Sequence, residues 1–341
     1  MDFVIIGQGI AGTFLSYYLH KAGKNVLVID EANPYSSSKV ASGVINPVTG
    51  RRLVTTWLID EIMPFAVNAY QQFEKELNAK LIRQCNVLDF HPTPQMQISF
   101  TERLKENAQY LQHTNNAEQW RKYFNYPLSV GEINPCYVVD LKTLLAEWRT
   151  VLKNNNQLIE EKIVVEEVVK KYNQTTIIFC DGINSAKNTY FNLLPFAPNK
   201  GEALIVEIKD LPPTNIFKQG TAIVPYANNL FWVGSSYEWN YNNANPSVLF
   251  KQKTEIQLNN WLKLPYKIID HIAAERPANI ERRPFVGLHP IHKNIGILNG
   301  LGTKGCTLAP YFANEFTENL VNGKPINPLA DVNRFTKILS K

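Results

Sequence analysis

Three glycines and one acidic residue near the N-terminus have types and spacings that suit the binding of a pyrophosphate and a ribose. The glycines form the pattern Gly7-x-Gly9-x-x-Gly12, and the acid is Asp30, eighteen residues later. Gly7 would permit a tight turn, Gly9 a close approach of the backbone to a phosphate, and Gly12 close packing of a helix on a sheet. The Asp30 carboxylate could accept hydrogen bonds from a ribose.

The elements that must position these residues can be read from the same stretch. The apolar run 3–6 predicts a buried parallel strand, residues 10–19 show helical spacing, and the apolar run 26–29 predicts a second strand that ends at Asp30. The free N–H groups at the start of the helix would favour phosphates. The glycine pattern alone also suits an ordinary glycine turn. With strand, helix, strand and acid in register, it predicts a dinucleotide site.

Composition places limits on the other classes of function. The chain has 341 residues, is 45% hydrophobic and 19% charged, and carries a net charge of +5. Such a mild charge suits anionic ligands, but no run of Lys and Arg is dense enough to argue for nucleic acid. No apolar stretch approaches the roughly 18–20 residues that span a bilayer. The first strand begins near residue 2 and leaves no room for a leader, so we expect a cytoplasmic protein.

Neither the cysteines nor the histidines form a metal-binding pattern. The four cysteines lie far apart without a CxxC pair, and the six histidines show no HExxH spacing. We therefore expect reduced thiols and no metal site. The cysteines are Cys85, Cys136, Cys180 and Cys306.

Patterns along the rest of the chain predict two domains. Helices are expected at residues 56–80, 101–126, 141–152, 247–262 and 307–320, and strands within 81–100 and at 161–169, 175–179, 203–208, 221–224, 230–233 and 295–298. Strand and helix patterns of the βαβ kind lie at both ends, and alternating strands lie in the middle. We expect a discontinuous Rossmann-type α/β domain (1–60, 137–198 and 270–341) with an inserted α+β domain of mainly antiparallel sheet (61–136 and 199–269).

Several short stretches, in this order and spacing, resemble one family. They are residues 7–12 with Asp30, 41–43, 179–185, 199–202, 223–225 with 233–234, 276–277, 284–287 and 300–310. Together they resemble the D-amino-acid oxidase superfamily of FAD-dependent oxidoreductases, which includes glycine oxidase, sarcosine oxidase and the oxidase half of a bifunctional tRNA-modifying enzyme. The resemblance covers most of the chain and is weaker between about residues 60 and 135.

The resemblance implies that FAD is the bound dinucleotide. The family's covalent cysteine falls at Ala274, so we expect non-covalent FAD. A glycine-rich loop before a helix offers N–H groups and a positive field to a reduced flavin, although a plain strand-to-helix turn is the alternative for 300–305. The implied FAD-binding residues are Gly7, Gly9, Ile10, Ala11, Gly12, Asp30, Glu31, Ala41, Ser42, Gly43, Val164, Val165, Gly182, Gly300, Gly302, Thr303, Lys304, Gly305 and Thr307.

The substrate side rests on fewer residues. An Arg-Pro pair in the family often binds the substrate carboxylate, and Arg276 matches it, although a structural ion pair is the alternative. Arg51, with Arg52, is a second candidate for an anion. A tyrosine that shares the carboxylate in glycine oxidase-like members is replaced by Ala222. Tyr237, Tyr226 or Tyr241 could take its place from neighbouring positions.

These features predict a flavoenzyme that oxidises the C–N bond of a small-molecule amino acid or secondary amine by hydride transfer, followed by imine hydrolysis. Sarcosine oxidase-like members place a lysine over the flavin where this chain has Phe231 and Trp232, which leaves the electron acceptor open. Two alternatives remain: a flavin oxidase that acts on a modified tRNA side chain, and a flavin-binding protein without turnover. Neither the amine nor the oligomeric state can be predicted.

Overall fold

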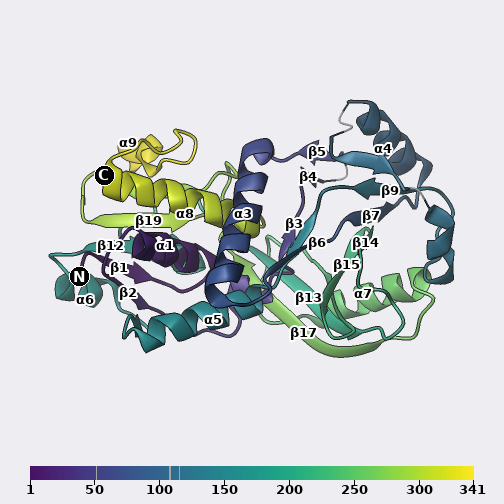
Figure 1. Ribbon diagram of the computed structural model, residues 1–341, viewed down its shortest axis with the longest axis horizontal. Coiled ribbons are helices and arrows are strands. Elements are labelled where there is room, and N and C mark those ends of the chain that lie inside the picture. Colours follow the sequence, from purple (N-terminus) through teal and green to yellow (C-terminus); the bar gives the residue numbers. More distant parts are fainter. Residues whose placement is uncertain (51, 107–108, 115) are drawn as a thin grey trace.

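The computed structural model describes residues 1–50, 52–106, 109–114 and 116–341. Two lobes lie side by side, and helix α3 (Ile59–Leu77) stands between them (Figure 1). Each lobe is built on its own large sheet. One sheet is mainly parallel and the other mainly antiparallel, which confirms the predicted Rossmann-type α/β domain and the second domain of mainly antiparallel sheet.

The first lobe is a six-stranded sheet with helices on both faces. Alternate residues of its central strand point to opposite faces: Ile5 joins the apolar cluster that contains Phe14 of α1, and Val4 joins the cluster that contains Val168 of α6. Among the described strands of this sheet, β18 alone runs antiparallel to its neighbour. In sheet order the strands are β11 (Leu158–Ile159), β2 (Val26–Ile29), β1 (Phe3–Ile6), β12 (Thr176–Phe179), β19 (Ile295–Asn299) and β18 (Phe285–Leu288); the helices are α1 (Ile10–Lys21), α5 (Leu141–Asn154), α6 (Val165–Lys171), α8 (Gly305–Asn322) and α9 (Thr336–Leu339).

The second lobe is an eight-stranded sheet that is covered on one face by α7 (Val248–Trp261). Leu204 and Phe231 pack with Leu258 of α7, and Ile205 and Trp232 point the other way into the cluster shared with the first lobe. This alternation fixes which residues of the sheet can reach the space between the lobes. The strands in sheet order are β17 (Lys267–Arg276), β13 (Asn199–Glu207), β16 (Leu230–Gly234), β15 (Thr221–Ala227), β14 (Ile216–Gln219), β7 (Val87–Phe90), β9 (Val130–Ile133) and β8 (Leu111–His113).

Smaller elements join the lobes. Strand β10 lies between β3 and β6 in a three-stranded sheet, and β4 and β5 form a short hairpin. Their bounds are β3 (Val44–Ile45), β10 (Tyr137–Val139), β6 (Ile82–Gln84), β4 (Val48–Thr49) and β5 (Val54–Thr55), with helices α2 (Ser37–Val40) and α4 (Pro94–Glu106) and 3-10 helices at Ala117–Lys122, Gly182–Lys187 and Val332–Phe335.

Three sequence expectations about elements were wrong. The strands expected throughout 81–100 end at Phe90, because Pro94 begins α4. The helix expected at 101–126 is instead the end of α4, strand β8 and a 3-10 helix. The strand expected at 161–169 is replaced by α6, in which Glu166 and Glu167 occupy the first turn and Lys170 and Lys171 the last, as the helix dipole favours.

The domain boundaries stay a prediction. The boundary placed between residues 269 and 270 falls inside β17, which pairs with β13 from Lys267 to Arg276. Strand β17 therefore belongs to the large sheet along its whole length.

Candidate functional site

A cavity of about 820 Å³ opens at the carboxyl ends of the parallel strands. Ligands of doubly wound sheets bind at this edge, and the volume lies within the usual range for small-molecule sites. Its wall contains residues 6–11 after β1, Asp30 and Glu31 after β2, and residues 180–184 after β12. Beyond β19 the wall of the cavity is completed by Leu301, Gly302, Thr303 and Gly305. Separate strands thus bring together the stretches that sequence analysis singled out.

Gly7 and Gly12 of the first turn have no room for side chains, and Gly9 has little. Gly7 has a φ of +98°, and a Cβ there would lie 2.7 Å from the carbonyl oxygen of Cys180. A Cβ on Gly12 would lie 1.9 Å from the carbonyl oxygen of Gly7, and one on Gly9 would lie 3.0 Å from Ser38 Oγ. The backbone before α1 therefore borders the cavity directly, and the positive end of this helix faces it. This cradle fits a pyrophosphate.

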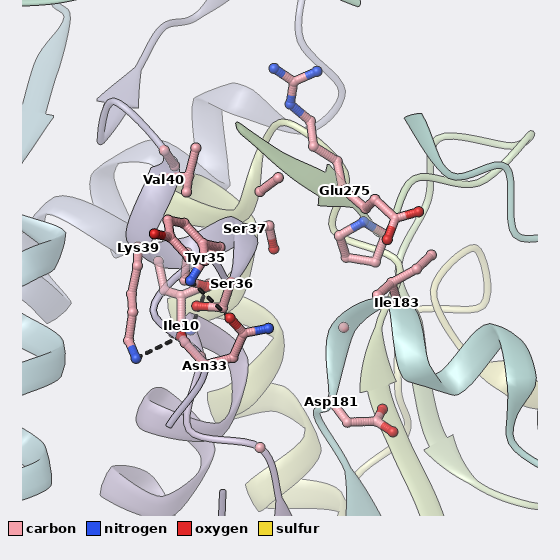
Figure 2. Close-up of a pocket in the computed structure, with 18 of the residues that line it drawn as sticks. Ile10, Asn33, Tyr35, Ser36, Ser37, Lys39, Val40, Asp181, Ile183 and Glu275 are labelled. Carbon is pink, nitrogen blue, oxygen red and sulfur yellow. Dashed lines mark hydrogen bonds between the residues drawn. The ribbon is translucent and has the colours of Figure 1, made fainter. Parts of the chain in front are cut away.

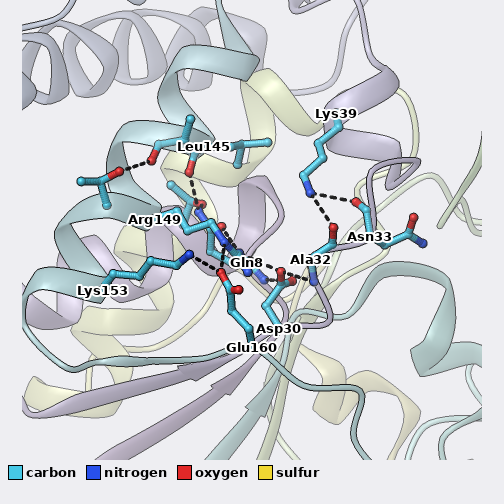
Figure 3. A network of polar contacts seen from close by, with 12 residues as sticks. Gln8, Asp30, Ala32, Asn33, Lys39, Leu145, Arg149, Lys153 and Glu160 are labelled. Atoms are coloured by element: carbon cyan, nitrogen blue, oxygen red, sulfur yellow. Dashed lines mark hydrogen bonds and ion pairs between the residues drawn. The ribbon is translucent and has the colours of Figure 1, made fainter.

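A polar network holds the Asp30 carboxylate at the cavity edge (Figure 3). The backbone N–H groups of Gln8 and Ala32 donate to it at 2.8 and 2.9 Å, and Arg149 Nη1 donates at 2.8 Å. Arg149 also donates to Gln8 Oε1 at 2.8 Å and to Glu160 at 2.9 Å. Sequence analysis missed Arg149, because nothing in the pattern of α5 separates it from the other polar residues of that helix.

The segment after β2 forms one side of the cavity. In Figure 2 Asn33, Tyr35 and Lys39 lie across the cavity from Asp181 and Glu275. Burial raises the pKa of Asp181 to about 7, although its hydrogen bond with Ser185 acts in the opposite direction. Neither the 33–40 segment nor Asp181 was predicted as a site residue, since polar loop residues carry no pattern that marks a binding wall.

The remaining residues expected to contact FAD lie in five kinds of place. Ala41, Ser42, Val165 and Gly182 line the cavity. Gly43 and Gly300 pack against backbone or side chains beside it, Thr307 is buried inside α8, and Val164 is 53% exposed. Lys304 lines a second, smaller cavity. Their contacts with FAD stay predictions.

The large sheet contributes the opposite wall through β17, and Arg276 ends that strand. Arg276 Nη1 donates to Asn199 Oδ1 at 2.8 Å and to the carbonyl oxygen of Ser236 at 3.2 Å. Its guanidinium carbon lies 5.4 Å from the ring centroid of Tyr237. Burial lowers the pKa of Arg276, and no carboxylate pairs with it among the described residues. Arg51, the third substrate candidate, lies outside the described residues.

Two positions at which the sequence departs from the family pattern, Trp232 and Ala274, also lie at this wall. Trp232 lines the cavity, and its Nε1 donates to the carbonyl oxygen of Val40 at 3.0 Å. Ala274 lines it as well. Tyr241 donates to Glu275 at 2.8 Å. Trp232 and Ala274 therefore add apolar surface to the wall on which Arg276 lies.

Other classes of site receive no support from the described part of the chain. The four cysteines are free and buried. Within residues 1–50, 52–106, 109–114 and 116–341 no cluster of His, Cys, Asp or Glu has the arrangement that holds a metal. None of the helices described there is long and apolar enough to cross a bilayer.

Comparison with known proteins identifies the family. Residues 2–319 match the family described as DAO, FAD dependent oxidoreductase. The chain is 23% identical to the uncharacterized oxidoreductase YurR of Bacillus subtilis (strain 168) over 95% of both chains. Among solved structures, iminodiacetate oxidase from Chelativorans sp. BNC1 has a TM-score of 0.73 at 18% identity over 96% of each chain. Glycine oxidase from Bacillus cereus ATCC 14579 has a TM-score of 0.76 at 14% identity over 100% of this chain and 98% of that one. The chain belongs to the DAO family of FAD-dependent oxidoreductases.

Proposed function

We propose that the protein oxidises the C–N bond of an amino acid or secondary amine to an imine, which water then hydrolyses. FAD, held by the cradle before α1, would supply the acceptor for the hydride that leaves the carbon next to nitrogen. The observation that carries the proposal is the position of Arg276 at the cavity wall without an acidic partner among the described residues.

Arg276 is suited to binding a carboxylate. A half-buried guanidinium that lacks a counterion has lost part of its hydration, and a carboxylate ligand would compensate with two parallel hydrogen bonds. Asn199 and Ser236 hold its Nη1, so the plane of the group is fixed. Its Nη2 lies over Gly201, which itself lines the cavity. The donor therefore sits where a ligand in the cavity can reach it.

The rest of the wall would orient the substrate and limit its contact with water. Trp232, Ala273, Ala274 and Leu301 give this part of the cavity an apolar surface. Hydride transfer from a neutral amine depends on orientation more than on a strong acid or base. The names of two similar structures, an iminodiacetate oxidase and a glycine oxidase, support an amine or amino acid as the substrate class.

The test is anaerobic reduction of the flavin-loaded protein by a panel of amino acids and N-substituted amines, followed by absorbance. One compound is expected to bleach the flavin. Arg276→Met is expected to keep its flavin and to lose reduction by carboxylate substrates, whereas Arg121→Met, at an exposed ion pair that does not line the cavity, keeps the wild-type rate. Equal rates in the wild type and Arg276→Met would exclude Arg276 as the carboxylate ligand. Absence of bleaching by every amine would remove the proposed reaction class.

A further inference from the structure

A second cavity of about 260 Å³ adjoins the first. Ser42 and Thr303 line both cavities, so these two side chains are the wall between them. The hairpin of β4 and β5 closes the far side, and Lys304 and Lys218 bring two ammonium groups to it. This cavity therefore lies directly beside the one proposed to bind substrate.

Among the described residues that line this cavity, Lys304 is a cation without an acidic partner. Its Nζ donates to the backbone carbonyl oxygen of Asn46 at 3.2 Å, and burial lowers its pKa to about 8. No Asp or Glu lines the cavity among the residues that the structure describes. Lys218, by contrast, pairs with Asp89 at 3.0 Å. A half-buried ammonium with one neutral acceptor is destabilised by lost hydration, and an anion in the adjoining space would reverse that loss.

The N-terminal end of α8 adds a positive electrostatic field beside Lys304. Lys304 immediately precedes α8, an 18-residue helix whose N-terminal end carries partial positive charge. The polar side chains of Ser42, Thr49 and Thr303 complete the lining on this side. A single unpaired ammonium matches a single carboxylate in charge. These features favour a carboxylate over a phosphate, which would bring nearly two charges.

We infer that the second cavity binds a carboxylate of the substrate, and that the substrate is an amine with two carboxylates, one for Arg276 and one for Lys304. The inference rests on the proposed function, because it takes Arg276 as the first anchor. It goes further by naming the substrate class. A molecule that occupies both cavities would pass from one to the other beside Ser42 and Thr303.

Binding of non-oxidisable acids tests the cavity without relying on turnover. We would titrate the flavin-loaded protein by calorimetry with malonate, succinate, glutarate and adipate, and with the monocarboxylates of equal chain length. At least one dicarboxylate is expected to bind roughly 10- to 100-fold more tightly than its monocarboxylate, which is the size of one charge-assisted hydrogen bond. Lys304→Met is expected to abolish the difference and Lys304→Arg to keep most of it. Lys324→Met, at an exposed lysine beyond the other end of α8, is the matched control.

The pH dependence of the wild type is an independent measurement, which holds even if Lys304→Met folds poorly. Raising the pH from 7 to 9 should weaken dicarboxylate binding and leave monocarboxylate binding unchanged, because Lys304 loses its proton near pH 8. The groups that face Lys304 are Cys136, whose pKa burial raises to about 12, and Lys218 with its partner Asp89. The same pH response for both kinds of acid would overturn the inference.

Inorganic phosphate is the second probe. Tight binding of phosphate that depends on Lys304, with no preference for dicarboxylates, would overturn the assignment to a carboxylate.

Reduction by iminodiacetate and by N-methylglycine, which differ by one carboxylate, separates this inference from the proposed function. Faster reduction by a two-carboxylate amine that requires Lys304 supports both. Equal reduction by one- and two-carboxylate amines, unaffected by Lys304→Met, overturns the inference and leaves the function standing. If neither amine reduces the flavin but dicarboxylates still bind in a way that needs Lys304, the assignment of the second cavity stands and the proposed reaction is refuted.

Discussion

The guanidinium of Arg276 occupies the space that a side chain at position 201 would need. A Cβ built on Gly201 would lie 1.8 Å from Arg276 Nη2 and 2.1 Å from its guanidinium carbon. Gly201 belongs to β13 and lines the cavity, so the guanidinium of Arg276 packs directly against the backbone of β13. This contact lies where the first residues of β13 pair with the last residues of β17. The glycine therefore leaves room for the guanidinium that we propose as the substrate-binding donor.

Gly201→Ala should displace Arg276 while the rest of the fold remains. The clash is with the far end of a long side chain, which can rotate away, so the stability loss should stay within about 1–3 kcal/mol. KM for a carboxylate substrate is expected to rise at least tenfold, with FAD content unchanged. Steady-state kinetics and urea unfolding check both parts. Gly23→Ala is the control for KM alone, because its added Cβ meets no atom within 4 Å but its φ of +71° strains an alanine. An unchanged KM would contradict the prediction.

Gly12→Ala should prevent FAD binding. The added Cβ would overlap the carbonyl oxygen of Gly7, which is backbone and cannot rotate away, so α1 must move off the sheet. We expect a stability loss of about 3 kcal/mol or more from this overpacking. FAD retained after gel filtration and urea unfolding are the measurements. A variant that keeps stoichiometric FAD would show that close packing of α1 is not required for the cradle.

Arg149→Met should weaken FAD binding through Asp30. The substitution removes the cation that bonds both Asp30 and Gln8, and leaves a mostly buried carboxylate with only backbone donors. Unfolding free energy is expected to fall by roughly 1–3 kcal/mol and the Kd for FAD to rise about tenfold. Flavin fluorescence titration measures the Kd. Lys153→Met removes an exposed partner of Glu160 and should change neither quantity; if it matches Arg149→Met, Asp30 is not the cause.

Asp181 should give the apoprotein a distinctive pH dependence. Burial raises its pKa to about 7, so the native state holds this proton more tightly than the unfolded chain does. Its contribution to stability is therefore present at low pH and is lost as the pH rises from about 4 to 7, with a slope of up to about 1.4 kcal/mol per pH unit. Asp181→Asn should flatten this part of the profile in urea unfolding at several pH values. Asp270→Asn, at another carboxyl of the cavity, is the control. Parallel profiles for the wild type and Asp181→Asn would refute the assignment.

Local rules in the sequence predicted the first lobe well. The glycine turn, the apolar run 26–29 and the helical spacing of residues 10–19 depend on neighbours a few residues apart, and the structure has β1, α1 and β2 there. The same holds for α7, because Ser247 caps it with its side chain.

One error fell where a long-range contact contributes to the structure. In α4 the alternating pattern of Met96, Ile98 and Phe100 suggested a strand, yet Ile98 is 56% exposed and only Phe100 is buried in that helix. The ring of Phe100 lies over Gly131 of β9, where a Cβ would be 2.3 Å away. This packing contact joins two residues that are thirty-one positions apart in the sequence, so a local sequence pattern cannot predict it.

The site was predicted in the same uneven way. A motif marked Arg276, and the ring of Tyr237 lies 5.4 Å from its guanidinium carbon, but the roles of both residues stay predictions. The direction of Lys304 could not be predicted, since it depends on the carbonyl oxygen of Asn46, which is distant in sequence.

The pairing of β17 with β13 also suggests a route for protein engineering. Asn199 stands opposite Arg276 in this ladder and accepts its hydrogen bond, so the cation is anchored by a cross-strand neighbour. Ala274 lies two residues before Arg276, on the same face of the strand and opposite Gly201, and it also lines the cavity. A library at position 274 would reshape the substrate space while the anchor and the cofactor cradle stay as they are.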